Sequence, residues 1–233
     1  DQMGNKVALN GTPQRIISTV PSQTELLFDL GLEENIVGIT KYCVHPRGLL
    51  DKIKTSPIPV FPYPSIPSVV GGTKRLNLGK IKELNPDLII GNKEENEKGQ
   101  ILELMKHYPV WMSDIKTLED ALFMIECIGK ITGKETKALK IQNDIREQFA
   151  HFKLSTQNLK QENRRIVYFI WKKPYICAGA NTFIDHILQI CGLENAFSTI
   201  TRYPEVTKEQ IQKTNPDLVL LSSEPYPFRE KHI

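Results

Sequence analysis

The sequence lacks a strong excess of charge of either sign. Lys and Arg number 30 and Asp and Glu number 27, which leaves a formal net charge of +3 in 233 residues. The basic residues are scattered, whereas nucleic-acid-binding domains usually gather Lys and Arg on one face. We therefore expect no nucleic-acid partner. Hydrophobic residues at 40% and charged residues at 24% are ordinary globular values, which excludes a disordered chain.

The chain also lacks the long apolar run that a membrane-spanning helix requires. Its longest segment without a charged residue, 55–73, contains five prolines, and prolines break a spanning helix. The first residues show neither the basic region nor the apolar region of a signal peptide. The sequence therefore predicts a protein that is either cytosolic or exported after removal of a signal.

Cysteine is scarce, and its spacing carries no known motif. The four cysteines form no CxxC pair, which excludes a zinc knuckle and a thioredoxin-type redox motif. Their even number allows up to two disulfides, and the alternative is that they are buried small hydrophobic residues. The four are Cys43, Cys127, Cys177 and Cys191.

The motifs of common enzyme classes are missing as well. HExxH, GxSxG and a GxGxxG that follows a strand do not occur. Residues 129–136 resemble a phosphate loop, but only three residues separate the glycines, and Glu135 replaces the magnesium-binding hydroxyl. The sequence therefore contains none of these catalytic motifs.

An internal repeat is the most informative feature of the sequence. Residues 81–90 (IKELNPDLII) return 130 positions later as residues 211–220 (IQKTNPDLVL). Each copy predicts a short amphipathic helix, ended by an Asn-Pro pair that a helix cannot accommodate, and then a buried strand. Upstream of each copy a further match, 15–17 (RII) and 165–167 (RIV), predicts another strand.

Both halves of the repeat also contain a helix that ends at a glycine. Residues 27–35 resemble 188–195, and Gly31 and Gly192 stand where a helix C-cap favours a left-handed residue. Strands and helices alternate in each half, which predicts βαβ crossovers and parallel sheets. The sequence therefore predicts an α/β protein of two Rossmann-like lobes.

The segment between the two halves has helical periodicity. Thr117 and Asp120 form a capping box at its start, and an apolar stripe follows at helical spacing. A helix over 134–160 would be about 40 Å long at 1.5 Å per residue. This long, rigid α-helix would hold a fixed cleft between the lobes. We predict an N-terminal lobe at 1–116, a helical connector at 117–161 and a C-terminal lobe at 162–233.

Two features near predicted strand ends suggest binding chemistry. Cys43 and His45 lie on one side of an extended segment, where a thiol and an imidazole suit a soft or borderline metal ion. Two ligands do not make a site, so the alternative is a structural pair. The acidic run at 94–97 follows a strand, where α/β proteins bind ligands. Its alternative is a solvated first helical turn whose acids face the helix dipole.

Several segments together match a known family. They are RIISTVPSQTELL at 15–27, VGIT at 37–40, NL at 77–78 and NPDLII at 85–90. These segments resemble the class III periplasmic substrate-binding proteins, the helical-backbone receptors of ABC importers. The resemblance covers nearly the whole chain and implies two lobes and a connecting helix. The family continues with a further helix and strand after the equivalent of residue 233, so we expect a truncated or reduced C-terminal lobe.

The resemblance also implies a function, that of a binding protein without a catalytic cofactor. The rival class is a two-lobe enzyme that acts at the cleft. Members capture vitamin B12 (cobalamin), haem or a ferric siderophore and deliver it to the membrane permease of an ABC importer. We rank cobalamin first and a ferric siderophore or haem second. A bare metal ion, held by Cys43, His45 and a carboxylate, comes third. The expected protein is a monomer that is periplasmic or exported and membrane-associated, and a cytosolic location stays open.

Aromatic residues are the expected ligand contacts, because a large flat chelate buries its faces against flat apolar side chains. Tyr42 and Tyr203 fall where cobalamin-binding members of the family place aromatic cleft residues. Trp171 is selected only by its place at the carboxyl end of a predicted strand. For each of the three, the alternative is an aromatic residue of the core or rim.

Other positions of the expected pocket are more polar than in cobalamin-binding members of the family. Thr73 and Asn92 stand where cobalamin-binding members carry tryptophans. Lys74, together with Lys93 and Glu94, would suit the carboxylates of a ligand or a metal chelate.

Docking onto the permease is expected to use one glutamate on each lobe. By resemblance the glutamate of the second lobe is Glu209. The internal repeat has an offset of 130 residues, so the counterpart of Glu209 in the first lobe is Gly79. A glycine cannot make that contact. The role of the first lobe passes to Glu83, one helical turn further on, or is lost. An ordinary solvated helix residue is the alternative for Glu209.

Overall fold

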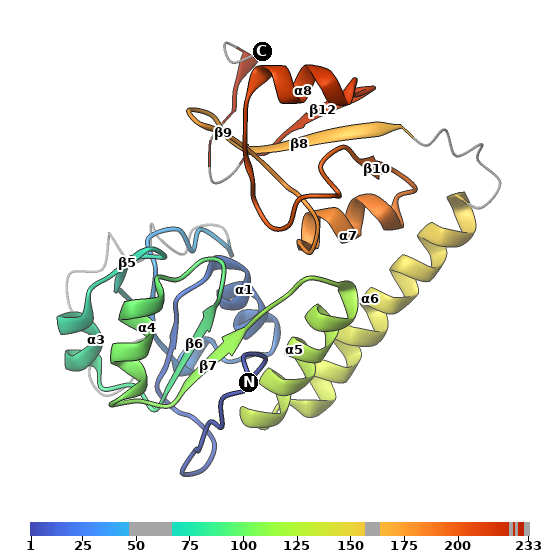
Figure 1. The fold of residues 1–233 in the computed structure, drawn as a ribbon. Coiled ribbons are helices and arrows are strands. Elements are labelled where there is room, and N and C mark those ends of the chain that lie inside the picture. Colours follow the sequence, from blue (N-terminus) through green and yellow to red (C-terminus); the bar gives the residue numbers. More distant parts are fainter. Residues whose placement is uncertain (47–66, 157–163, 224–225, 227, 231–233) are drawn as a thin grey trace. The chain divides into compact units, whose positions relative to one another are not determined.

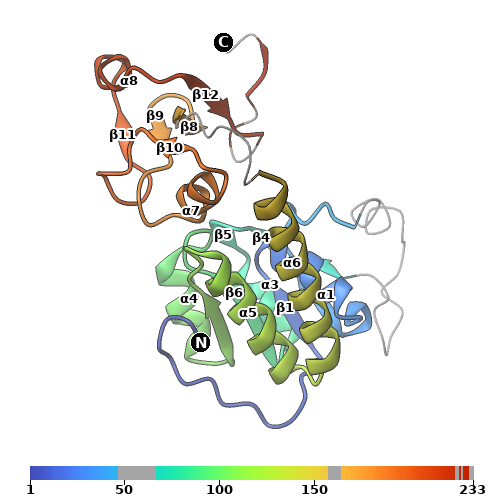
Figure 2. The ribbon, with the colours of Figure 1, turned by 90° about the vertical axis from the view of Figure 1, so that its right-hand side faces the viewer.

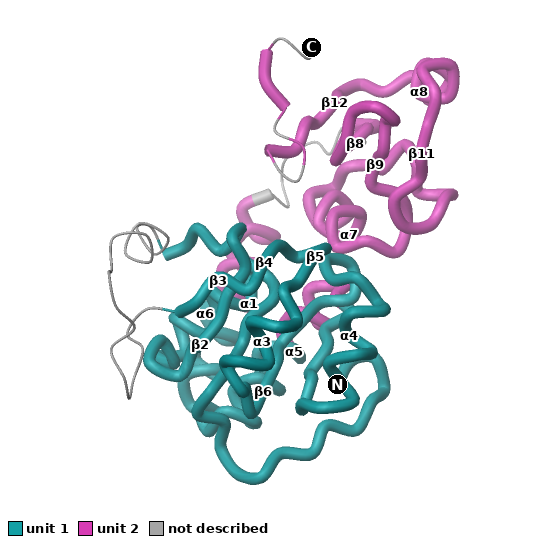
Figure 3. The backbone as a smooth tube through the Cα atoms, turned by 90° about the vertical axis from the view of Figure 1, so that its left-hand side faces the viewer, with its two compact units in different colours: residues 1–114, 123–144 teal, residues 115–122, 145–233 magenta. Residues whose placement is uncertain are grey.

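The computed structural model describes residues 1–46, 67–156, 164–223, 226 and 228–230 (Figure 1). These residues form two compact units (Figure 3). Unit 1 comprises residues 1–114 and 123–144, and unit 2 comprises residues 115–122 and 145–233. The two units divide the connecting helices between them, and the sequence-based division at 1–116, 117–161 and 162–233 stays a prediction.

Unit 1 is built on a parallel sheet with the strand order β3-β2-β1-β6-β7. Strands β1, β2 and β7 are buried along their whole length, as expected for a sheet covered on both faces. The parallel sheet predicted for this half is confirmed. The strands are β1 (Ile16–Ser18), β2 (Ile36–Ile39), β3 (Ser68–Val69), β6 (Leu88–Asn92) and β7 (Val110–Ser113).

Helices cover both faces of this sheet (Figures 1 and 2). On one face, α3 (Leu78–Leu84) and α4 (Lys98–Met105) join the strands in a common hydrophobic core. On the other face lie α1 (Pro21–Asp29) and the parts of α5 (Leu118–Ile131) and α6 (Glu135–Thr156) that belong to unit 1.

The predicted connecting helices α5 and α6 are present and lie side by side (Figure 2). The capping box at the start of α5 is confirmed, because the Asp120 N–H donates to Thr117 Oγ1 at 3.1 Å and the Thr117 N–H to Asp120 Oδ2 at 2.9 Å. Gly129 allows the close approach of the two helices, since a Cβ there would lie 2.3 Å from the Cβ of Ala138. Helix α6 covers 22 residues of the predicted 134–160.

Unit 2 has a mixed sheet around its central strand β8 (Arg165–Trp171). Strands β10 (Glu194–Asn195) and β12 (Leu218–Leu221) pair with β8 in parallel, as predicted. Strand β9 (Tyr175–Cys177) pairs with β8 in the antiparallel sense, because a connection of three residues is too short for a crossover. Strand β11 (Glu205–Val206) then adds antiparallel to β9. The sheet is therefore only partly parallel.

Besides its parts of α5 and α6, unit 2 contains the helices α7 (Phe183–Ile190) and α8 (Lys208–Thr214). Each begins at a threonine N-cap: Thr182 accepts from the Asp185 N–H at 3.1 Å, and Thr207 from the Gln210 N–H at 3.2 Å. The order β8, α7, β10, α8, β12 repeats the order β1, α1, β2, α3, β6 of unit 1. The predicted two-lobe α/β fold is confirmed.

The helix ends of the repeat have the same backbone conformation in both units. Asn85 ends α3 with a φ of 43°, and Asn215 ends α8 with a φ of 45°. Gly31 and Gly192 follow α1 and α7 with φ values of 72° and 71°. These left-handed residues stop each helix and turn the chain towards the next strand. The predicted C-caps are therefore confirmed.

The aspartate of each Asn-Pro-Asp segment binds back to the start of the central strand. Asp87 accepts hydrogen bonds from the N–H groups of Gln14 at 2.7 Å and Arg15 at 2.9 Å. Asp217 likewise accepts from the N–H of Arg165 at 2.7 Å. Each arginine side chain donates to carbonyl oxygens at the end of the helix before the Asn-Pro pair. The residues of the repeat thus form the same hydrogen-bonded connection between helix and strand in both units.

The described residues contain no helix with both the length and the apolar character needed to cross a bilayer. All four cysteines are free, and Cys43 and Cys177 are fully buried. The interpretation as buried small residues holds for these two, whereas Cys191 is exposed. Burial raises the pKa of the Cys177 thiol to about 12.

Candidate ligand-binding surface

The carboxyl ends of the parallel strands meet at one edge of the sheet in unit 1, where α/β proteins bind their ligands. Tyr42 follows β2, and Asn92 ends β6. Thr73 and Lys74 form the turn of a hairpin between β4 (Gly71–Gly72) and β5 (Arg75–Leu76) that follows β3. The structure therefore brings four of the sequence-predicted ligand residues to one edge.

Tyr42 is an exposed aromatic residue at this edge, with 52% of the residue exposed. Its ring lies against Gly72, where an added Cβ would stand 3.2 Å from Tyr42 Cε2. The Lys41 ammonium group is 5.1 Å from the centre of the same ring. The loop is anchored by the Lys41 N–H, which donates to the Gly71 carbonyl at 2.9 Å. Tyr42 is thus an exposed aromatic ring on a supported loop.

Thr73 and Asn92 are directed into the protein instead. Thr73 is only 7% exposed. The Asn92 amide donates to Ser113 Oγ at 2.9 Å and accepts from the Glu94 N–H at 2.8 Å. These contacts of Asn92 hold the loop after β6 in place. Thr73 and Asn92 therefore support the loops beneath the exposed surface.

Asn96 connects the loops at this edge, a role that its place after a predicted strand does not by itself reveal. It is 6% exposed, and its Oδ1 accepts from Thr19 Oγ1 and from the Asn92 N–H, both at 2.9 Å. Its Nδ2 donates to the Thr73 carbonyl at 3.0 Å. One buried amide therefore fixes the loops after β1, β4 and β6 relative to one another.

Charged groups surround the exposed part of the edge. The Lys74 ammonium donates to the Glu94 carbonyl, and Lys93 pairs with Asp114 at 2.7 Å. Glu97 is the N-cap of α4, accepting from the N–H groups of Gly99 and Gln100, which lower the pKa of its carboxyl. Glu97 therefore caps the helix, and the first turn of α4 itself contains no acidic residue.

Cys43 and His45 lie in different environments. The Cys43 thiol is fully buried and lies 3.0 Å from Thr24 Oγ1 and 3.3 Å from Thr40 Oγ1, whereas His45 is exposed. Among the described residues no group of three or more His, Cys, Asp or Glu could hold a metal ion. Cys43 therefore anchors the Tyr42 loop to the core.

In unit 2, Trp171 and Tyr203 differ in their surroundings. Trp171 ends β8, is 37% exposed and packs edge-on against Tyr226 with ring centres 5.3 Å apart. Tyr203 is half-buried in the segment before β11. Both are accessible aromatic residues of unit 2.

The proposed docking residues occupy matching helices. Glu209 is the second residue of α8, exposed, and Gly79 is the second residue of α3. Backbone N–H donation and the Thr207 hydroxyl lower the pKa of the Glu209 carboxyl. A Cβ on Gly79 would meet only Asn77 Oδ1, at 3.5 Å. Glu83 is exposed but pairs with Lys80 at 3.1 Å.

Two α/β units with this repeated topology define the class of two-lobed substrate-binding proteins. The chain matches the family described as "Periplasmic binding protein" over residues 16–232. It therefore belongs to the periplasmic binding protein family, whose members bind substrates for transport rather than catalyse reactions.

Individual relatives extend this result. The chain is 27% identical over 218 residues to the vitamin B12-binding protein of Vibrio parahaemolyticus, covering 91% of this chain and 72% of that protein. It is 23% identical over 226 residues to an uncharacterized ABC transporter substrate-binding lipoprotein of Bacillus subtilis, covering 94% and 67%.

Solved structures agree with the sequence relatives. The periplasmic vitamin B12 binding protein of Vibrio cholerae superposes with a TM-score of 0.74 at 25% identity, covering 90% of this chain and 76% of that chain. A periplasmic heme-binding protein of Roseiflexus sp. RS-1 superposes with a TM-score of 0.73 at 20% identity, covering 91% and 76%. The second likeness shows the fold alone.

Proposed function

We propose that the protein captures a large metal chelate and delivers it to the permease of an ABC importer. Cobalamin is the first choice of ligand, and a ferric siderophore or haem is the second. The single observation that carries the proposal is Tyr42, an exposed aromatic ring on an anchored loop at the ligand-binding edge of the sheet. The names of the relatives favour cobalamin among these ligands.

The geometry around Tyr42 suits a flat ligand. Because Gly72 has no side chain, the ring of Tyr42 can lie close to the hairpin. An aromatic contact of this kind contributes about 1 kcal/mol beyond the area that it buries. Because Thr73 and Asn92 support the loops, Tyr42 and Lys74 are the exposed groups that we propose to meet the ligand. In unit 2, Trp171 and Tyr203 are proposed contacts.

The test is a titration of the protein with cobalamin, haem, a ferric siderophore and zinc in parallel. Quenching of the fluorescence of Trp111 and Trp171, the two tryptophans of the chain, reports binding. We expect micromolar or tighter binding of cobalamin, weakened tenfold or more by Tyr42→Ala. Tyr42→Phe is the matched control, because it keeps the ring and removes only the hydroxyl group. It should bind within about threefold of the original protein.

Specific outcomes would contradict the proposal. If Tyr42→Phe and Tyr42→Ala weaken cobalamin binding equally, the ring makes no stacking contact. If haem or a siderophore binds and cobalamin does not, the second choice of ligand replaces the first. If zinc alone binds and Cys43→Ser abolishes binding, the chelate proposal is wrong.

Docking on the permease is the second part of the proposal. Glu209 offers a charged carboxylate on an exposed helical turn, and hydrogen bonds from the backbone and the Thr207 hydroxyl hold the pKa of that carboxyl below its ordinary value. Opposite charges across such an interface steer encounter and fix orientation. Unit 1 offers Gly79 at the equivalent position, and the pairing of Glu83 with Lys80 makes it a weaker substitute. We propose that the protein acts as an exported monomer whose docking depends mainly on Glu209.

A further inference from the structure

The buried Asn96 side chain is connected to the exposed Tyr42 ring through the β4–β5 hairpin. The Asn96 Nδ2 group donates to the Thr73 carbonyl at 3.0 Å, and Thr73 lies in the turn of that hairpin. The residue before the turn, Gly72, is the one against which the Tyr42 ring lies. A displacement of the hairpin would therefore displace the surface on which the ring rests.

The surroundings of Asn96 match the two ends of an amide. Its Oδ1 accepts from Thr19 Oγ1 and from the Asn92 N–H, both at 2.9 Å. Its Nδ2 faces two carbonyl oxygens, that of Thr73 at 3.0 Å and that of Thr19 at 3.3 Å. A carboxylate has no donor for these carbonyl oxygens, and an apolar side chain would leave both ends of the site unpaired.

The neighbouring strand leaves the space that this amide occupies. A Cβ on Gly91 of β6 would lie 2.7 Å from Asn96 Oδ1 and 3.0 Å from Thr19 Oγ1. Asn96 itself is only 6% exposed. The amide is thus paired at both ends and enclosed, and it offers almost no surface to a ligand.

We propose that Asn96 is a positioning residue for ligand binding, which holds the β4–β5 hairpin, and with it the Tyr42 ring, in the arrangement that meets the ligand. The inference rests on the proposed function, because Tyr42 is the contact through which Asn96 acts. Loops that are ordered before binding lose less conformational freedom on binding, so their loss of order weakens affinity although no ligand contact is removed.

The test replaces Asn96 by aspartate, which has nearly the same shape. In its protonated form the acid has one O–H donor and one carbonyl acceptor, whereas its ionised form cannot donate to the Thr73 carbonyl. Burial beside carbonyl oxygens should raise the pKa of the introduced carboxyl above its ordinary value of about 3.9. With cyanocobalamin as the probe, Asn96→Asp should bind at least tenfold more weakly than the original chain at pH 8 and within about threefold of it at pH 5.

A matched control separates the buried contacts from the added charge. Asn77 is the exposed N-cap of α3 directly after the hairpin, where an aspartate caps as well as an asparagine. Asn77→Asp should bind within about twofold of the original chain at both pH values. The other charged groups near these loops are present in every variant, so their titration cancels in the comparison. They are Lys74, Lys93, Glu94, Glu95, Glu97 and Asp114.

Hydrogen exchange in the free protein tests the inference without a ligand. The Lys41 N–H donates to the Gly71 carbonyl at 2.9 Å, and the Asn77 N–H donates to the Val70 carbonyl at 2.8 Å, so both amides report the position of the hairpin. After correction for the intrinsic rate, both should exchange at least tenfold faster in Asn96→Asp than in the original chain at pH 8. At pH 5 the difference should disappear.

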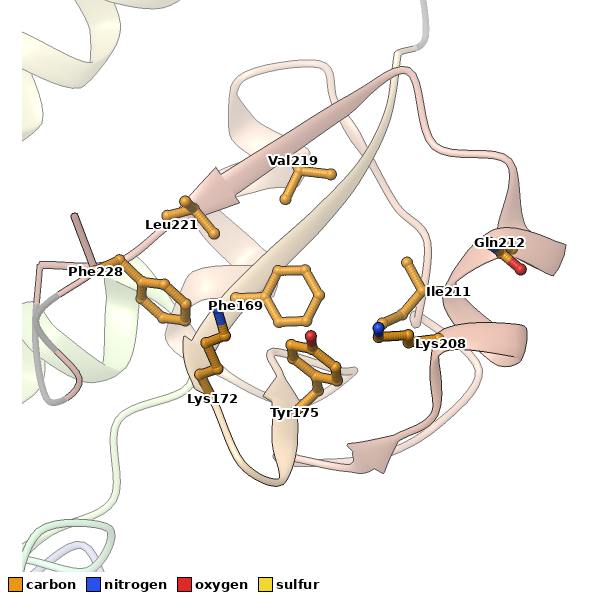
Figure 4. Close-up of a pocket in the computed structure, with 9 residues that line it drawn as sticks. All are labelled: Phe169, Lys172, Tyr175, Lys208, Ile211, Gln212, Val219, Leu221 and Phe228. Atoms are coloured by element: carbon orange, nitrogen blue, oxygen red, sulfur yellow. The ribbon is translucent and has the colours of Figure 1, made fainter. Parts of the chain in front are cut away.

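Amides away from the hairpin serve as references. In unit 1 the reference is the Ile89 N–H of β6, which donates to the Pro109 carbonyl at 2.9 Å. In unit 2 it is the pair β8 and β9, where the rings of Phe169 and Tyr175 pack with their centres 5.5 Å apart (Figure 4). Exchange at both references should be the same in Asn96→Asp and in the original chain.

Several results would overturn the inference. Equal exchange at Lys41 and Asn77 in both chains at pH 8 is one, because the hairpin then holds its place without the amide. Equal losses of affinity at pH 5 and pH 8 are another, because the donor at position 96 then has no effect. Faster exchange at the references as well would indicate a general loss of stability. If cyanocobalamin does not bind the original chain, the proposed ligand is wrong, and the exchange data alone decide the role of Asn96.

Discussion

Removal of the Asp87 carboxylate should destabilise unit 1 by about 3 kcal/mol. The carboxylate accepts two backbone hydrogen bonds, from Gln14 at 2.7 Å and Arg15 at 2.9 Å. Hydrogen bonds to a charged group contribute roughly 1.5 to 3 kcal/mol each. We take the lower part of that range, because the contacts are exposed or only partly buried and water replaces part of each lost bond.

The internal repeat supplies a matched comparison. Asp217 occupies the equivalent place in unit 2, and within the described part of the chain it accepts one backbone hydrogen bond, from Arg165 at 2.7 Å, in an exposed setting. Asp217→Ala should therefore cost unit 2 about 1.5 kcal/mol. Asp87→Asn should give an intermediate loss for unit 1, because the amide keeps one acceptor oxygen without the charge.

The assay uses one tryptophan as a reporter of one unit. Trp111 is 3% exposed in unit 1, and Trp171 lies in unit 2. In a Trp171→Phe background, urea unfolding followed by fluorescence reports unit 1 through Trp111. With a slope of about 2 kcal/mol per molar urea, Asp87→Ala should lower the midpoint by roughly 1.5 M. Unit 2 is followed in a Trp111→Phe background.

A loss of less than about 1 kcal/mol in unit 1 on Asp87→Ala would refute the expected contribution of these hydrogen bonds. An equal loss in unit 2 on Asp217→Ala would refute it as well. Either result would mean that the number and burial of the hydrogen bonds do not set their contribution.

Four further predictions concern docking and the thiols. In a reconstituted importer, Glu209→Lys should reduce substrate delivery at least tenfold and leave ligand binding unchanged; equal transport would argue against docking through this residue. Gly79→Glu should increase delivery, because it adds a carboxylate in the first turn of α3 where only Asn77 Oδ1 is near, and Gly79→Gln is its uncharged control. With a thiol reagent at pH 8, Cys191 should react first and Cys177 only on unfolding, since burial raises the Cys177 pKa to about 12. Because the folded pKa of Cys177 lies above its ordinary value of 9.0, its contribution to stability is full below about pH 9 and is lost as the pH rises towards 12. The free energy of unfolding of unit 2 should fall over that window, and it should fall less steeply in Cys177→Ala; an unchanged slope would exclude this thiol as its cause.

The sequence by itself determined the repeated architecture of the protein. The Asn-Pro-Asp segments could be interpreted locally, because a proline ends a helix wherever it occurs and Asn tolerates a left-handed backbone. Gly31 and Gly192 were equally local signals. Apolar runs at strand and helix spacing then predicted the order of elements. Matching residues at an offset of 130 identified Gly79 as the counterpart of Glu209, and the shared positions in α3 and α8 agree with that assignment.

Only the tertiary structure decided which side chains are accessible and which are used within the protein. Thr73 and Asn92 have polar side chains that suit a ligand, but their burial and hydrogen bonds depend on Asn96 and on loops far apart in sequence. Cys43 and His45 are two positions apart, yet the hydroxyl groups of two threonines surround only the thiol. Burial depends on packing between distant segments, whereas caps and turns depend on a few neighbouring residues.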